Sequence, residues 1–324
     1  RGLGDVYKRQ TYLFHHAFND FDEFAEAAQA WDLEFIQLDR GKFNGELHQM
    51  GVQGMQVSHA RFNRQLYQRG SSPKGMRTFA ITEEWSPPPK WRHQEIPRNS
   101  IMLFKDRSLD VVSAVGFDVF TISLDDESLD FAMQSGGYEG IEKIYHKADV
   151  VTGDYSAIKG VINYLRQLFD TLNQNRMIID DHRFTQKVKN DITNNLLNAS
   201  ETQTGVFRKP KRKLSEDKFR KVENLIKEKS SEPILIKDLC QIVNTSERTL
   251  RRAFWERYGI SPLCYVKSLR LNTVRKELHR SNSKKTKVVD IANRWGFWHM
   301  GQFAFDYRRL FGELPSETLA KANR

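Results

Sequence analysis

Two helix-turn-helix patterns follow one another near the end of this chain of 324 residues, and they limit its fold more than any other feature. Each pattern has apolar residues at helical spacing, a short turn, and a second helix that ends at a glycine. The first pattern is formed by Ile236, Leu239, Cys240, Val243, Leu250, Phe254 and Gly259. The second is formed by Val288, Ile291, Ala292, Trp295, Phe303, Tyr307 and Gly312. The offset is 52 residues from Ile236 to Val288 and 53 from Leu250 to Phe303, so both copies share one register.

The residues around these patterns indicate where the helices begin and end. Ser246 stands where an N-cap residue is preferred, and Pro262 begins a further apolar stretch that extends to about Arg280. A single pattern of this kind is weak evidence for a DNA-binding helix-turn-helix, because any small helical bundle contains apolar residues at the same spacing. Two copies in register, joined by a spacer helix, predict a duplicated module whose second helices enter the major groove of DNA.

The distribution of charge supports this interpretation. Residues 1–200 carry 23 basic and 27 acidic side chains, a net charge of −4, whereas residues 201–324 carry 28 basic and 14 acidic side chains, a net charge of +14. DNA binding draws its sequence-independent affinity from the neutralisation of phosphates by Lys and Arg. RNA or an anionic membrane would also attract a basic surface, but neither accounts for paired helix-turn-helix patterns.

Residues 218–319 resemble the DNA-binding domain of the AraC/XylS family of transcription regulators, including the spacer helix. Within that family, residues 296–303, 306–307 and 315–316 are similar to regulators of ethanolamine utilisation, and residues 41–46 resemble the sensor domain of those regulators. The resemblance implies a transcription regulator that binds double-stranded promoter DNA, acts with RNA polymerase, and senses a small-molecule effector through a cupin-like domain. The sequence leaves open whether the regulator is an activator or a repressor.

Three arginines, Arg248, Arg251 and Arg252, occupy one face of the first recognition helix, opposite Leu250 and Phe254. The resemblance implies that this face reads bases. Arginine suits that role, since its guanidinium pairs bidentately with guanine O6 and N7 at about 1–3 kcal/mol per good contact. We expect two of the three arginines to contact base edges and at least one to contact a phosphate. The DNA-contacting residues predicted in this unit are Ser246, Arg248, Thr249, Arg251 and Arg252.

The second recognition helix does not repeat this readout. An offset of 53 places Gly301, Ala304 and Phe305 at the positions of the three arginines, although family members often carry an arginine where Phe305 stands. The remaining candidates for hydrogen bonds to DNA, or for contact with a thymine methyl, are His299, Met300 and Gln302. We therefore expect the first helix-turn-helix pattern to supply most of the discrimination between DNA sequences, and the second mainly to dock on the DNA.

Further basic residues lie outside the recognition helices. Lys284, Lys285 and Lys287 precede the second unit, where they fit phosphate contacts and solvated loop charges equally well. The basic run at residues 208–213 is interpreted as a solvated tether rather than a DNA-contacting arm, because such a composition cannot bury enough surface to fold alone.

The first 200 residues are long enough to form a domain with its own core. Asp20 and Glu23 form a candidate capping box at the start of a short helix. Segments with strand character follow at residues 31–38, 46–59, 76–81, 101–104, 109–114 and 119–124. Because clusters of Gly, Pro and Asp separate them, they predict an antiparallel barrel or jelly roll.

Helical periodicity returns towards the end of this half. Apolar stripes extend from Ile158 to Leu172 and from Phe184 to Leu196, and they fit core packing better than a homodimer interface. The fold class predicted is α+β, with an N-terminal cupin-like antiparallel β-barrel and helices, then an all-α DNA-binding domain. The predicted organisation is a non-native leader at 1–10, an effector-sensing domain at 11–150, a helical segment with a candidate dimerisation role at 151–200, a basic linker at 201–215, and a double helix-turn-helix domain at 216–324.

Enzymatic activity is not expected of this chain. The sequence has no signature of a catalytic nucleophile, no P-loop and no dinucleotide-binding fingerprint. Metal-dependent cupins use a His-x-His pair with a later Glu and His, which is absent here, and convergence of His48, His59 and Glu46 on an ion stays a remote alternative. No catalytic, metal or cofactor residues are therefore assigned.

The effector and its site are not identified by the sequence. Trp31, Phe35, Trp85 and Trp91 would line a ligand site inside the barrel or, more simply, fill its core. A second function class is a constitutive or architectural DNA-binding factor whose N-terminal half only dimerises. A cavity in that half distinguishes the two, since a filled core leaves no room for an effector.

The two cysteines of the chain, Cys240 and Cys264, both fall on apolar helix positions. They are therefore expected to be buried free thiols. So few cysteines, without a signal peptide or a long apolar run, favour a cytoplasmic location without membrane contact.

Overall fold

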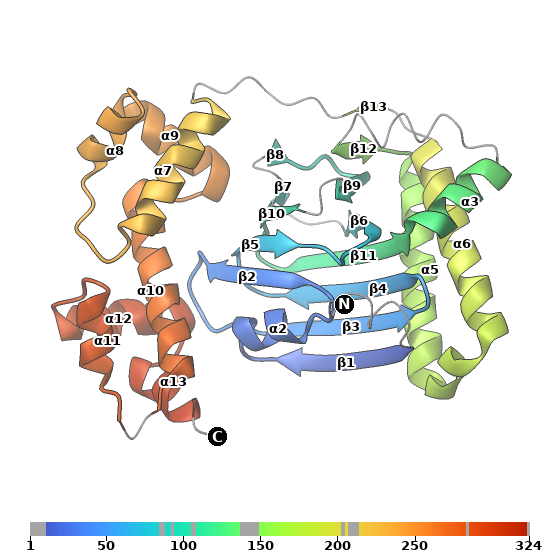
Figure 1. Ribbon diagram of the computed structural model, residues 1–324, viewed down its shortest axis with the longest axis horizontal. Helices are drawn as coiled ribbons and strands as arrows, with labels where there is room; N and C mark the ends of the chain where they lie inside the picture. Colours follow the sequence, from blue (N-terminus) through green and yellow to red (C-terminus); the bar gives the residue numbers. More distant parts are fainter. Residues whose placement is uncertain are drawn as a thin grey trace. The chain divides into compact units, whose positions relative to one another are not determined.

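A computed structural model of the protein describes residues 11–83, 88–91, 94–104, 108–136, 149–201, 205–206, 214–282 and 285–322 (Figure 1). By its internal contacts the chain divides into two compact units. The first comprises residues 1–34, 44–63 and 68–208, and the second comprises residues 35–43, 64–67 and 209–324.

The strands of the N-terminal half form two sheets. In spatial order, the larger sheet contains β1 (Tyr12–Phe18), β3 (Gly45–Val52), β4 (Met55–Phe62), β11 (Phe117–Asp125), β6 (Met76–Thr82), β9 (Ser100–Phe104), β12 (Val150–Thr152) and β13 (Gly205–Val206). The smaller contains β2 (Asp32–Gln37), β5 (Leu66–Ser71), β10 (Ser108–Val112), β7 (Lys90–Trp91) and β8 (Gln94–Glu95). The expectation of an antiparallel sheet domain is confirmed. The single cupin-like barrel is not closed, because the described strands divide between these two sheets.

Three long helices and a 3₁₀ turn, besides the short helix α2, belong to the same unit as the larger sheet (Figure 1). They are α3 (Asp126–Gly136), α5 (Tyr155–Gln174), η1 (Arg176–Asp180) and α6 (His182–Glu201). The apolar stripe of α5 is buried from Ile158 to Leu172, and it shares one hydrophobic core with Met50, Val57 and Ile122 of the sheet. The expectation of core packing for these stripes is therefore confirmed.

The short helix α2 (Phe21–Ala27) begins where the sequence predicts. The Asp20 side chain accepts hydrogen bonds from the backbone N–H groups of Asp22 at 2.8 Å and Glu23 at 3.3 Å. An acidic N-cap satisfies donors that the first helical turn would otherwise leave without partners.

The second unit contains all helices of the tandem module. They are α7 (Glu216–Glu228), α8 (Ile236–Ile242), α9 (Glu247–Tyr258), α10 (Pro262–Arg280), α11 (Val288–Arg294), α12 (Met300–Phe311) and α13 (Pro315–Lys321). Helices α9 and α12 end in the same way, at Gly259 with φ +72° and Gly312 with φ +75°. A side chain with a Cβ atom is strained in this left-handed conformation, which explains why both copies carry glycine there.

The spacer helix α10 packs as expected, whereas one cysteine does not. Its apolar positions Val266, Leu269, Leu271, Val274 and Leu278 are all buried. Cys240 in α8 is buried, as expected, but Cys264 is exposed. The prediction for Cys264 was wrong because this residue lies in the first turn of α10, just after the N-cap Ser261, on the side that faces solvent.

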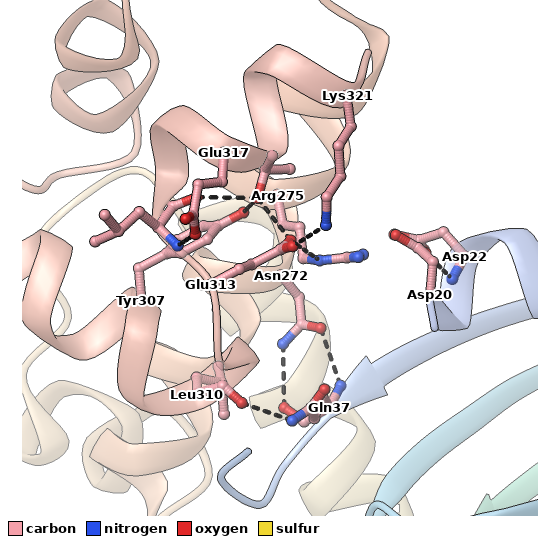
Figure 2. Close-up of polar contacts among 12 residues, drawn as sticks. Asp20, Asp22, Gln37, Asn272, Arg275, Tyr307, Leu310, Glu313, Glu317 and Lys321 are labelled. Atoms are coloured by element: carbon pink, nitrogen blue, oxygen red, sulfur yellow. Dashed lines mark hydrogen bonds and ion pairs between the residues drawn. The ribbon is translucent and has the colours of Figure 1, made fainter. Parts of the chain in front are cut away.

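Polar contacts fix α10 and α12 inside the second unit (Figure 2). The buried side chain of Gln37 donates to the carbonyl oxygen of Leu310 at 2.6 Å, and the Gln37 N–H donates to Asn272 Oδ1 at 2.9 Å. Glu313 accepts a hydrogen bond from Thr318 Oγ1 at 2.7 Å and lies 3.6 Å from the Nε atom of the buried Arg275. The amide nitrogens of Gln37 and the carboxylate of Glu313 thereby keep hydrogen-bond partners inside the unit.

Candidate DNA-binding surface

Helix α9 presents an arginine-rich face to solvent. The helix begins at the N-cap Ser246, whose Oγ accepts a hydrogen bond from Thr249 N at 3.2 Å. Arg248, Arg251 and Arg252 are all exposed, while Leu250 and Phe254 are fully buried on the opposite side. The sequence prediction that these arginines share an outward face is consistent with this arrangement. Their guanidinium groups are accessible to a polyanion.

Two of these arginines are held by neighbouring carboxylates on the same helix. Arg251 Nη2 lies 2.5 Å from Glu247 Oε1, and Arg252 Nε lies 2.5 Å from Glu256 Oε1. Exposed pairs four residues apart contribute only about 0.3–0.5 kcal/mol. Such pairs can therefore exchange for contacts with bases or phosphates at small cost.

The corresponding face of α12 is mostly uncharged. Gly301 and Phe305 are exposed and Ala304 is half-buried. A Cβ atom added at Gly301 would meet no heavy atom within 4 Å, so this position lies in open space. No arginine therefore stands at the three positions of α12 that correspond to Arg248, Arg251 and Arg252 of α9.

The polar candidates on α12 are arranged unequally. His299 is exposed at the N-cap but its side chain makes no capping hydrogen bond, and Met300 is half-buried. Gln302 donates from Nε2 to Asp306 Oδ2 at 3.0 Å, and the same carboxylate lies 2.5 Å from Lys267 Nζ of the spacer helix. Gln302 must therefore give up a hydrogen bond before its amide can reach a base edge.

The comparison of the two sequence patterns missed one exposed cation of α12, Arg308. In α9, Trp255 follows the three arginines by one turn and is 65% exposed. The repeat offset of 53 pairs it with Arg308, which is also exposed and lies one turn after Ala304 and Phe305 on the same face. Carrying the comparison of the two copies one turn further would have found it.

The lysines that precede the second helix-turn-helix pattern are only partly described. Lys285 and Lys287 are exposed, and Lys285 N donates to Asn282 O at 3.0 Å in a turn. Lys284 lies outside the described residues. The contact of these lysines with phosphate stays a prediction.

The aromatic residues considered for an effector site mostly fill the protein interior. Phe35 and Trp91 are buried, and Trp31 donates from Nε1 to Gln56 Oε1 at 2.9 Å. Trp85 lies outside the described residues. A cleft of about 790 Å³ lies elsewhere in the first unit, between α3, α6 and the turn after β3, and its lining includes Asp125, Phe131, His182, Lys189 and Asn190.

Residues 239–321 match the family described as helix-turn-helix domain. These residues form a helix-turn-helix domain of the AraC/XylS type. The "Probable thc operon regulatory protein" of Rhodococcus erythropolis is 36% identical over 90 residues, which cover 28% of this chain and 27% of that protein. The "XylDLEGF operon transcriptional activator 2" of Pseudomonas putida is 33% identical over 102 residues, which cover 32% of this chain and 65% of that protein.

Several solved structures cover a similar share of the chain. Among them is that of a probable AraC family transcriptional regulator from Rhodopseudomonas palustris CGA009, with 36% sequence identity over 33% of this chain and 98% of the other, and a TM-score of 0.31. The chain spans about a quarter of the length of its Rhodococcus relative. Among the described residues, the structure contains no helix that is both long and apolar enough to cross a membrane.

Proposed function

We propose that this protein is a sequence-specific DNA-binding transcription regulator of the AraC type. The observation that carries the proposal is the outward arginine face of α9, because residues 239–321 of this chain match a known helix-turn-helix family. Guanidinium groups on a helix that fits the major groove provide both base readout and phosphate neutralisation.

The two recognition helices divide this work unequally. Helix α9 supplies the base contacts through Arg248, Arg251 and Arg252, while α12 supplies mainly shape and backbone contacts. Helices of this kind that contact one face of DNA enter major grooves about 34 Å apart. One chain is then sufficient for a complete site.

Selection of bound sequences from a random DNA library tests the proposal directly. We expect enrichment of a bipartite site with guanine-containing positions in one half, and binding that weakens steeply as the salt concentration rises. Failure to enrich any sequence, with binding explained by charge alone, would support an architectural factor instead.

Removing a carboxylate beside the arginine face should strengthen DNA binding. In Glu256→Gln, Arg252 loses its ion-pair partner and the surface loses one negative charge that repels phosphate. We expect a gain of about 0.3–1 kcal/mol in binding free energy, measured by fluorescence anisotropy. Glu228→Gln makes the same charge change at an exposed position of α7 and should change affinity less. Equal gains would mean that only net charge matters.

Adding an arginine to the uncharged face of α12 should increase the contribution of this helix. At Gly301 a new side chain meets open space, so Gly301→Arg should fold normally and reach the DNA backbone. The slope of log affinity against log salt is expected to steepen by about 1. Gly301→Ala is the matched control, because it makes the same backbone change without a charge. An unchanged slope in Gly301→Arg would place this face away from DNA.

We further propose that a small molecule bound by the N-terminal half controls DNA binding and recruitment of RNA polymerase. The cleft beside α3 and α6 supports this, because its lining combines Asp125 and Lys189, whose charged groups lie 3.5 Å apart, with the exposed ring of Phe131. Such a mixture suits a small polar molecule with one apolar edge.

A thermal-shift screen of amines including ethanolamine, amino acids and aromatic acids tests this proposal. The expected result is a compound that raises the melting temperature and changes DNA affinity in the wild type but not in Lys189→Ala. If no compound alters either property, a constitutive factor whose N-terminal half serves dimerisation is the better explanation.

A further inference from the structure

A compact group of metal-ligating side chains lies on the larger sheet of the first unit. β1 and β3 pair so that His15 faces His48, and Glu46 lies two residues before His48 on the same face of β3. One ligand atom from each of these three residues lies within 4.8 Å of the others. Two imidazoles and one carboxylate therefore converge at one point of the sheet.

The hydrogen bonds of this group leave one nitrogen unused. His15 Nε2 and Glu46 Oε1 are 2.6 Å apart, and the second oxygen of Glu46 contacts the guanidinium of Arg61. His48 is 9% exposed, and its Nε2 atom is buried without a hydrogen-bond partner among the described residues. Buried polar atoms normally have partners, so this nitrogen requires an explanation.

His59, the third residue considered from the sequence, does not join the group. It faces His48 across the β3–β4 pair, but its Nε2 lies 2.8 Å from Asp118 Oδ1 and its ring stacks on Phe120 at 3.9 Å. His15 takes its place. The carboxylate of Asp118 thereby holds His59 away from the point where His15, Glu46 and His48 meet.

An aromatic ring from a helix lies beside the group. The centroid of the Phe169 ring of α5 is 5.4 Å from that of the His48 ring. Part of the surroundings of His48 is therefore apolar.

We propose that His15, Glu46 and His48 bind one divalent transition-metal ion of the zinc type. Ligand atoms about 2.1 Å from a shared ion lie at most about 4.2 Å apart, so small side-chain rotations suffice to close the observed spacing. The ion lies between His15 and Glu46 and takes an imidazole nitrogen of His48 as a third ligand. Two histidines and one carboxylate match the donor set of zinc and related ions, with water completing the exposed side. This site is independent of the proposed DNA-binding function.

Titration of the full-length protein, free of any histidine tag, with Co²⁺ and then Zn²⁺ tests the site. We expect one Co²⁺ per chain with visible ligand-field absorption, and loss of that absorption when Zn²⁺ displaces it. His15→Ala and Glu46→Gln should each weaken binding by at least about tenfold. Both residues are partly exposed, so these variants should fold, which circular dichroism checks.

His16→Ala is the matched control, because His16 is an exposed histidine on the same strand but outside the group. It should leave both stoichiometry and affinity unchanged. Binding far from one ion per chain, or equal weakening by His16→Ala and His15→Ala, would show that exposed histidines bind the ion nonspecifically and would overturn the proposal. These outcomes do not involve DNA, so they are separate from any failure of the DNA-binding experiments.

Discussion

Replacing Arg248 or Arg252 with alanine is expected to weaken binding to the selected DNA site by about 1–3 kcal/mol, which is roughly a fivefold to 150-fold loss. Both side chains are exposed on α9, and truncation to alanine leaves the buried residues Leu250 and Phe254 in place. The loss should therefore come from DNA contacts rather than from unfolding. A gel-shift titration of the selected site and of a scrambled site measures it.

The comparison with α12 gives this prediction its specificity. Gln302→Ala should cost less, because its amide already donates to Asp306 and must leave that partner to reach DNA. A base-reading arginine should affect the selected site more than the scrambled site, whereas a phosphate contact should affect both alike. Equal losses for Arg248→Ala, Arg252→Ala and Gln302→Ala would contradict the unequal division between the two helices.

The second large effect is expected on the free energy of unfolding, when Glu313 of the helical region is replaced. Glu313→Gln should lower the free energy of unfolding by about 3 kcal/mol, since it removes the negative charge facing Arg275, whose side chain is 4% exposed. The same carboxylate contacts Lys321 (Figure 2). It also accepts a hydrogen bond from Thr318. Urea denaturation near neutral pH measures the loss. Glu317→Gln on α13 is the matched control, because it perturbs only one hydrogen bond at the start of that helix and should cost about 0.5–1 kcal/mol.

The pH dependence of this effect follows from the pKa of Glu313. Burial favours the neutral form, but contacts with Lys321, Thr318 and Arg275 outweigh it and hold the pKa below its ordinary value of 4.5. A carboxyl group with a lowered folded-state pKa stabilises the fold above its unfolded-state pKa and loses this contribution as the pH falls through the folded value. The difference between wild type and Glu313→Gln should thus be constant near neutral pH and shrink below about pH 4.5. A difference that grows in acid would contradict this assignment.

Local signals were sufficient to predict the tandem helices. Ser246 marks the start of a helix by N-capping, and Gly259 and Gly312 mark helix ends by their left-handed backbone conformation. Both effects depend only on residues within about one helical turn. The β3–β4 hairpin was predicted as one extended segment, although Gly54 with φ +75° marks its turn. The predicted segments also overlap β2, β6, β9, β10 and β11, whereas β5, β7, β8, β12 and β13 were not predicted.

Long-range pairing could not be predicted from local patterns. β1 reads Tyr-Leu-Phe-His-His-Ala-Phe without polar and apolar alternation, so neither the strand nor its pairing with β3 was expected. That pairing is what brings His15 to His48. The division into two sheets likewise depends on which strands meet, because strand propensity contains no information about closure.

The missing charges at Gly301, Ala304 and Phe305 also affect how target promoters should be searched. If only α9 discriminates bases strongly, the information content of aligned operators will be concentrated in one half-site, while the other half tolerates substitution at a fixed spacing. A genome scan that weights both halves equally would then miss true operators. Scoring the half-site contacted by α9 heavily, and requiring only the correct spacing of the second, would recover them.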